Sequence, residues 1–260
     1  MTPFMLGGMN TSEILRELCR IPEFNEFYHN EWVPIGIPLE VYINHSCPQY
    51  ALFYIDNGKL FIELRPLQVG PNNAELIGFL VAHEMLHAIH YKKGMQLEFK
   101  MCNEIIKEIN IDKRDIVDLA YRFGSMFDDP LVDSYLQNRY GFDPAEFYIK
   151  VKIPDTIKGI KSEKKRTSDD LIILKQALFY SQFELQFTYI TNEKAIHRWN
   201  SLKNMYEKKR PKVKKLGDKI YSITIETGYD TLEKQRASFD KIADMCMIKG
   251  VRLKEIICYV

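Results

Sequence analysis

One stretch of the sequence constrains the fold more than any other, because it joins a dense apolar run to a pair of histidines. The apolar run covers residues 76–81 and leads into the pattern H-E-x-x-H, formed by His83, Glu84 and His87. On an α-helix, residues four positions apart lie about 6 Å apart along the axis and about 40° apart around it. Both imidazoles can therefore reach one metal ion from the same face of a helix.

The expected burial of this helix favours metal binding, because a metal would satisfy polar side chains that are otherwise costly to bury. The apolar residues before the pattern predict a buried helix, and burying two histidines and a glutamate without partners is energetically costly. A zinc ion would satisfy His83 and His87, and Glu84 would lie beside it, placed to take a proton from a metal-activated water. The less favoured alternative is an ordinary helix whose histidines are satisfied by backbone groups or carboxylates.

The segments before the motif helix predict a small sheet. Residues 39–43, 50–55 and 59–64 are rich in β-branched and aromatic residues, as strands are. Asn57 and Gly58 predict a hairpin turn between the last two segments. We therefore expect an α+β fold, in which a small, mostly antiparallel sheet packs on the motif helix and a mainly helical region follows.

A catalytic zinc site usually has three protein ligands and a water, so a third ligand is needed. His90 lies on the same helical stripe, but it is about 10 Å of rise from His83, too far for one metal on a straight helix. A better candidate is the acidic segment at residues 128–133, which contains Asp128, Asp129 and Asp133. Glu104 and Glu108 are weaker candidates and are expected to face solvent.

With this acidic segment, residues 39–140 resemble the gluzincin-type zinc metallopeptidases. In that family a sheet leads into the H-E-x-x-H helix, and a later helix supplies an acidic third ligand and, four positions on, a residue that orients a histidine. The resemblance implies a zincin-like fold, Asp129 as the ligand and Asp133 as the orienting residue, with Asp128 as the alternative ligand. The family's usual ligand is Glu, which is one methylene longer. The competing interpretation is that Asp128 and Asp129 cap a new helix beginning beside Pro130.

The resemblance implies a zinc-dependent metallopeptidase that hydrolyses peptide bonds with Glu84 as general base, acting on a peptide or protein bound along the sheet edge. The alternative is a binding or regulatory protein on the same scaffold with weak or no proteolysis, because no oxyanion donor stands out. The candidates for that donor are Tyr135, Tyr140, His197, Tyr221 and Tyr229.

Charge is distributed unevenly along the chain. Residues 1–150 carry 13 Lys+Arg against 21 Asp+Glu, whereas the remainder carries 23 against 14. This shift predicts a metallopeptidase domain over 1–150, a basic connector over 151–167 and a mainly helical region of unassigned role over 168–260. Residues 208–219 hold seven basic residues, for which a solvated loop is favoured over a nucleic-acid contact because no aromatic residues interleave.

Helix signals place further boundaries. The motif helix is expected to begin near Asn72 or Asn73 and to end at Gly94. Separate helices are expected over 96–110, over 112–124, and from Asp128 to Gly141. Beyond the connector, helices are expected from a cap at residues 168–170, from the cap Asn192 and over 230–249. Residues 219–227 are expected to form a strand, with a helix start as the alternative. The aromatic residues of 179–189 are expected in the core or at an intersubunit face.

The cysteines and the N-terminus bear on the compartment. The five cysteines are scattered without a C-x-x-C, which is typical of reduced thiols rather than disulfides. No secretory signal is visible at residues 1–8, and no apolar stretch is long enough to span a membrane. We expect a cytoplasmic protein without a membrane partner; the sequence does not define its oligomeric state.

Overall fold

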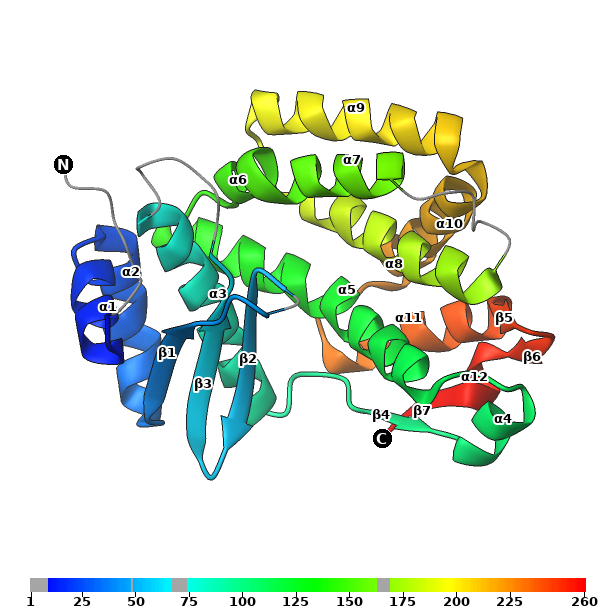
Figure 1. Ribbon diagram of the computed structural model, residues 1–260, viewed down its shortest axis with the longest axis horizontal. Coiled ribbons are helices and arrows are strands. Elements are labelled where there is room, and N and C mark those ends of the chain that lie inside the picture. The colour runs from blue at the N-terminus through cyan, green and yellow to red at the C-terminus, as the bar shows by residue number, and fades with distance from the viewer. Residues whose placement is uncertain (1–8, 48, 67–73, 163–168) are drawn as a thin grey trace. The chain divides into compact units, whose positions relative to one another are not determined.

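The computed structural model describes residues 9–47, 49–66, 74–162 and 169–260 (Figure 1). Its contacts divide the chain into two compact units, each formed from two segments. Unit 1 comprises Met1–Gly94 and Val132–Pro154, and unit 2 comprises Met95–Leu131 and Asp155–Val260. The two units therefore do not follow a single cut near residue 150, because the segment after Gly94 groups with the C-terminal part.

Unit 1 contains a three-stranded sheet of β1 (Leu39–Ile43), β2 (Ala51–Asp56) and β3 (Lys59–Leu64), in the order β1-β3-β2. The predicted strands and the hairpin turn are confirmed, with φ of 48° at Asn57 and 75° at Gly58. The expectation of a mostly antiparallel sheet is only half right. β2 is antiparallel to the central strand β3, whereas β1 is parallel to it, because the chain crosses from β1 to the far edge before it turns back.

The motif helix α3 (Ala74–Lys92) packs on one face of this sheet (Figure 1). Strand β3 alternates between half-buried residues and buried Leu60, Ile62 and Leu64, so one face is apolar. Helix α3 is apolar on all sides, and it contacts both β2 and β3. It ends as predicted at Gly94, whose φ of 65° suits a left-handed cap. Its predicted start at Asn72 or Asn73 lies outside the described residues.

Short helices complete unit 1. They are α1 (Thr11–Leu18), α2 (Pro22–Phe27), the π-helix η1 (Tyr28–Trp32), the 3-10 helix η2 (Val33–Ile35), α6 (Pro144–Phe147) and the π-helix η3 (Tyr148–Lys152). Helices α1 and α2 approach α3 at Gly78, where an added Cβ would lie 3.1 Å from Ile21 Cδ1. The N-terminal eight residues, on which the absence of a secretory signal was judged, lie outside the described residues.

Helix α5 runs without interruption over Lys113–Tyr140 and contributes to both units. The prediction of two helices, with a new one starting at Asp128, is therefore wrong. Pro130 lies inside the helix, where its missing N–H and its ring cost about 3 kcal/mol. Fully buried Phe127 and Val132 lie on either side of it, and their packing offsets this cost. Asp128 and Asp129 are interior residues of a helix and do not cap one.

Unit 2 is mainly helical. Its elements are β4 (Phe99–Met101), α4 (Asn103–Glu108), α7 (Ile153–Ser162, from Asp155 on), α8 (Asp170–Gln186), α9 (Glu193–Lys209), α10 (Pro211–Thr227), α11 (Leu232–Met245), β5 (Met247–Ile248), β6 (Val251–Arg252), α12 (Leu253–Ile256) and β7 (Ile257–Tyr259). No helix in the described ranges has the length and apolarity needed to cross a membrane.

Several boundaries in this unit differ from those expected. Residues 219–227 belong to helix α10, not to a strand. Tyr221, Ile223 and Ile225 alternate as in a strand, but the buried residues of α10 are three or four positions apart, as on one face of a helix: Val213, Gly217, Ile220 and Thr224. The basic run 208–219 covers the end of α9 and the start of α10, and Arg210 between them is buried, so most of the run is helix and not a solvated loop. Residues 96–110 hold a strand as well as a helix. Much of the predicted connector is helix α7, and residues 163–168 of it lie outside the described residues.

Helix α8 forms the centre of this unit, as its aromatic residues predicted. Tyr180 and Phe183 are buried, and Phe183 stacks on Trp199 of α9 with ring centroids 5.0 Å apart. The predicted caps are also confirmed. Asp169 accepts a hydrogen bond from Leu171 N, and Asn192 accepts one from Ala195 N.

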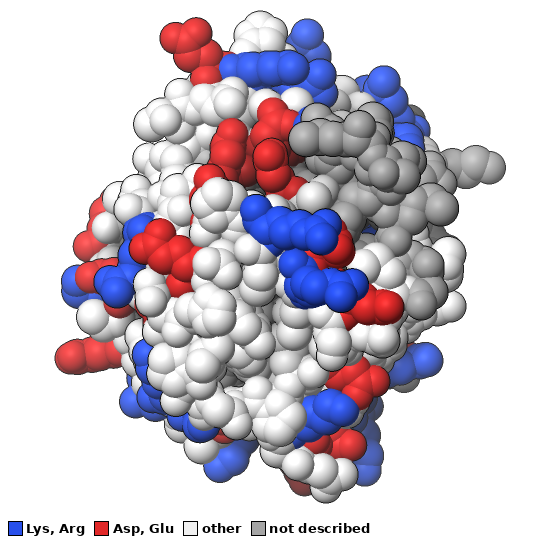
Figure 2. All heavy atoms as spheres, turned by 90° about the vertical axis from the view of Figure 1, so that its left-hand side faces the viewer, with Lys and Arg blue, Asp and Glu red and all other residues white. Residues whose placement is uncertain are grey.

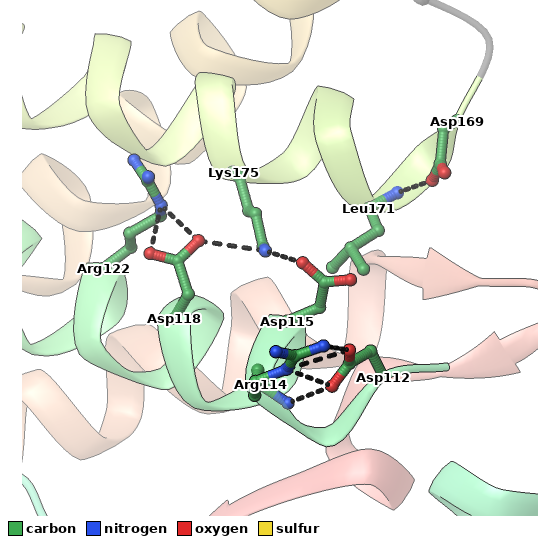
Figure 3. A network of polar contacts seen from close by, with 8 residues as sticks. All are labelled: Asp112, Arg114, Asp115, Asp118, Arg122, Asp169, Leu171 and Lys175. Atoms are coloured by element: carbon green, nitrogen blue, oxygen red, sulfur yellow. Dashed lines mark hydrogen bonds and ion pairs between the residues drawn. The ribbon is translucent and has the colours of Figure 1, made fainter. Parts of the chain in front are cut away.

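An ion-pair network joins α8 to the first half of α5 (Figure 3). Lys175 Nζ lies 2.8 Å from Asp115 Oδ1 and 2.9 Å from Asp118 Oδ2, and Arg122 Nε also contacts Asp118. Burial alone would raise the pKa of Asp118, but hydrogen bonds from Lys175 and Arg122 outweigh it and hold that pKa below its usual value. The ionised carboxylate therefore helps to hold the two helices together.

Charges of both signs are mixed over the face shown in Figure 2, with broad uncharged areas between them. No single sign covers that face. It therefore gives no support for attraction of a highly charged partner there.

A tight approach between α10 and α8 yields a stability prediction. A Cβ at Gly217 would lie 2.5 Å from Tyr180 Cδ1 and 3.1 Å from the Ala177 carbonyl oxygen. We expect Gly217→Ala to lower the free energy of unfolding, since overpacking costs roughly 1–3 kcal/mol and exceeds the helix-propensity gain of about 1 kcal/mol. Urea denaturation measures this. The control is Gly124→Ala in α5, where the added methyl meets no atom within 4 Å and should stabilise; equal effects of both substitutions would contradict the packing argument.

Candidate metal centre

The two histidines of α3 present the same ring nitrogen to each other. His83 Nε2 and His87 Nε2 are 2.9 Å apart, and the ring planes are nearly perpendicular at 78°. Two nitrogens bound to one tetrahedral zinc at about 2.0–2.1 Å lie about 3.3 Å apart. Small side-chain rotations would therefore bring both nitrogens to the spacing that a shared zinc ion requires.

Asp133 fixes which nitrogen of His83 is available. Asp133 Oδ1 lies 2.9 Å from His83 Nδ1, so the contact expected from the sequence is present. A carboxylate at Nδ1 holds the proton there and leaves the lone pair on Nε2, the nitrogen that faces His87. The tautomer that a metal ligand needs is thus the one that the local hydrogen bond favours.

Asp133 is itself held by a residue that the sequence analysis missed. The Tyr148 hydroxyl donates a hydrogen bond to Asp133 Oδ2 at 2.7 Å, and both side chains are buried. Tyr148 begins the π-helix η3, fifteen positions after Asp133, and no motif connects the two in the sequence. Both carboxylate oxygens of Asp133 therefore have donors, which makes its orientation rigid.

Aromatic rings flank the histidines. Phe53 of strand β2 is nearly parallel to the His87 ring, with centroids 6.1 Å apart, and Phe79 lies 5.8 Å from the His83 ring. Phe79 precedes His83 by one helical turn, whereas Phe53 comes from the sheet. These contacts restrict both imidazoles and shield them from water.

Asp129 lies four residues before Asp133 in the continuous helix α5. Such residues are about 40° apart around a helix, whereas Asp128 is rotated by a further 100° or so. One ligand atom each from His83, His87 and Asp129 lies within 4.8 Å of the others, the grouping expected from the sequence. The described residues therefore favour Asp129 over Asp128 as the third donor.

The two adjacent aspartates receive separate glutamine amides. Gln182 of α8 donates from Nε2 to Asp129 Oδ2, and Gln96 Nε2 lies 2.6 Å from Asp128 Oδ2. Asp128 is buried and Asp129 is half-buried. Neither glutamine was singled out by the sequence analysis, since an isolated Gln distant in the sequence carries no motif.

The remaining candidates differ in how deeply they are buried. Glu84 is buried with 9% of its surface exposed, in keeping with a place beside the histidines. His90 is half-buried and is not part of the metal-ligating group. Glu104 and Glu108 are exposed, as expected.

The tyrosines considered as oxyanion donors have other partners. Tyr135 and Tyr140 both donate to Glu31 Oε1. Burial alone would raise the pKa of Glu31, but these hydrogen bonds and the charge of Arg139 outweigh it and lower that pKa. Burial, and then the hydrogen bond to Glu31, raises the pKa of Tyr135 and of Tyr140.

The other three donor candidates lie in unit 2. The Tyr229 hydroxyl contacts that of Tyr189. His197 lies on α9 and Tyr221 on α10. Nothing in the described geometry selects among the five.

Comparisons with known proteins give no relative for this chain. No protein-family model, no curated protein and no solved structure matches it. The resemblance to gluzincin-type enzymes therefore depends on the motif residues and their geometry.

The donor set suits zinc. Two imidazole nitrogens and one carboxylate oxygen are ligands that zinc accepts, and such a set leaves the fourth tetrahedral position for water or substrate. The carboxylate behind His83 is the usual second partner of a zinc-bound histidine.

The orienting contact can be tested by Asp133→Asn, which keeps the side-chain shape and removes its charge. We expect zinc affinity to fall about 10- to 100-fold, the usual cost of removing such a partner, as measured by competition with a chromogenic chelator. Asp143→Asn is the control, because Asp143 caps α6 in the same unit and Asn is an equally good cap. Equal affinities for Asp133→Asn and the control would show that Asp133 does not tune His83.

Proposed function

We propose that this protein is a zinc-dependent metallopeptidase on a zincin-like fold, with His83, His87 and Asp129 as metal ligands. The observation that carries the proposal is the pair of Nε2 atoms 2.9 Å apart, one of them set by Asp133 at the opposite ring nitrogen. Two Nε2 atoms this close together on one face of a helix have the arrangement that two imidazole ligands of a single zinc ion need. The presence of Asp129 in the same group supplies the third donor.

The motif residues have distinct chemical roles in such an enzyme. A zinc ion held there would polarise the scissile carbonyl and lower the pKa of a water. Glu84 accepts the proton of the attacking water and delivers it to the leaving nitrogen. Asp133 keeps His83 in the required tautomer throughout, and Tyr148 keeps Asp133 in place.

A peptide is the substrate that the sheet supports best. Within the described residues β2 pairs only with β3, so its other edge offers backbone donors and acceptors to an extended chain. Phe53 on this strand contacts the His87 ring, which places the strand beside the motif. A peptide added along β2 would pass close to the histidines.

One observation favours a binding or regulatory protein instead. The hydroxyls of Tyr135 and Tyr140 are both engaged by Glu31, so neither is available to an oxyanion while those hydrogen bonds persist. Such a protein would hold zinc and bind a peptide segment without cleaving it.

Metal content tests the ligand set. Elemental analysis of the purified protein should give about one zinc per chain, as a three-ligand site of this kind implies, and His87→Ala and Asp129→Ala should each lose or weaken the metal. Glu104→Ala, an exposed acidic residue, should retain it. If the wild-type protein contains no zinc and takes up none when zinc is added, the enzyme hypothesis is wrong.

Glu84→Gln separates catalysis from metal binding. The amide cannot accept the proton, so peptide hydrolysis should fall by at least about 100-fold, while zinc content stays near that of the wild type. A quenched-fluorophore peptide library measures hydrolysis. If zinc-loaded wild type cleaves nothing, and both forms bind the same peptides, the binding or regulatory function is correct.

A further inference from the structure

Helix α8 places an amide on the aspartate proposed as the third metal ligand. Gln182 Nε2 donates to Asp129 Oδ2, and both residues belong to unit 2. Gln182 is buried, with 5% of its surface exposed. A buried amide on a buried helix cannot swing away into solvent as a surface glutamine would, so the direction of its N–H is fixed by the fold.

The chemistry of this contact suits a metal ligand. A donor fixed on Oδ2 restrains the orientation of the whole carboxylate, which is what a ligand to a cation at a fixed position requires. Glutamine is neutral, so it orients the carboxylate without neutralising it as Lys or Arg would. Asp also has one fewer torsion than Glu, and an external donor on Oδ2 restrains the remaining rotation about its Cβ–Cγ bond.

The surroundings of Gln182 explain how the contact is held. Its neighbour Phe183 stacks on Trp199, and Lys175 two turns earlier pairs with Asp115 and Asp118 of α5. Lys175 thus ties α8 to the helix that carries Asp129, and Phe183 ties it to α9. The position of the amide depends on these contacts.

We propose that Gln182 is a positioning residue for Asp129, the proposed third zinc ligand. This inference rests on the proposed zinc site. It gives a specific role to the mainly helical C-terminal region, for which the sequence predicts none. Through Gln182 this region orients Asp129, so that the shorter carboxylate can serve where gluzincin-type enzymes use Glu.

The test is a double-mutant cycle on zinc affinity in the full-length protein. Gln182→Leu removes the amide and keeps the volume, and it should weaken zinc binding about 10- to 100-fold, as loss of a partner behind a ligand does. Asp129→Asn should weaken binding as well. In the double variant the Gln182 substitution should add no further loss, because the carboxylate that it orients is already gone.

A matched control separates positioning from stability. Gln235 of α11 is also a buried glutamine, and its Nε2 donates to the Tyr229 carbonyl at 3.0 Å. Gln235→Leu should cost comparable stability in urea denaturation but leave zinc affinity unchanged. Gln182→Met, which keeps the length of the side chain, replaces Gln182→Leu if that variant does not fold.

Two results would overturn the inference: unchanged zinc affinity in Gln182→Leu, or a loss that adds fully to that of Asp129→Asn. Failure of the zinc site itself is a different result, since the wild type would then show no affinity at all. If the protein binds zinc but hydrolyses no peptide, the proposed peptidase function is wrong, whereas the positioning role of Gln182 still holds.

Discussion

The hydrogen bond between Asp133 and His83 is the interaction on which the candidate metal centre depends. It gives His83, which lies in an apolar helix, a defined tautomer. It also joins α3 to α5, although the two residues are fifty positions apart in the sequence. With the proton held on Nδ1, the other ring nitrogen, Nε2, faces His87. The Tyr148 hydroxyl donates a hydrogen bond to Asp133 and holds its carboxylate in place. Asp133 in turn orients the His83 imidazole.

Helix α5 is the element that makes this possible. It carries Asp129 and Asp133 on one face, and its last turns carry the tyrosines that bind Glu31. Interruption of this helix would change the angle between the aspartates. Its continuity through Pro130 therefore matters more for the site than the local cost of the proline, because the relative position of Asp129 and Asp133 follows from helical geometry alone.

The sequence predicted those parts that depend on local patterns. The structure contains the predicted strands, the turn at Asn57-Gly58 and the helix caps at Asp169 and Asn192. Each of these is marked by residues close together in the sequence. The contact of Asp133 with His83 was implied by the resemblance to gluzincin-type enzymes, which Asp129 and Asp133 match in their spacing. The parallel pairing of β1 with β3 and the helix at 219–227 were missed because packing against a distant element decides them.

Two further failures have clear physical causes. Pro130 and its acidic neighbours form a typical helix start, and only the buried side chains around them reveal that the helix continues. Gln96, Gln182 and Tyr148 act through single hydrogen bonds to residues far along the chain. No periodicity or motif marks such partners, so a single sequence cannot identify them.

The placement of Asp129 and Asp133 one turn apart has a consequence for the charge of the site. Two carboxylates at this spacing repel each other, and burial of the second makes the repulsion stronger. A divalent cation bound between them would offset this repulsion, because it would attract both carboxylates. The charge of the metal would thus stabilise helix α5 locally as well as serve the site.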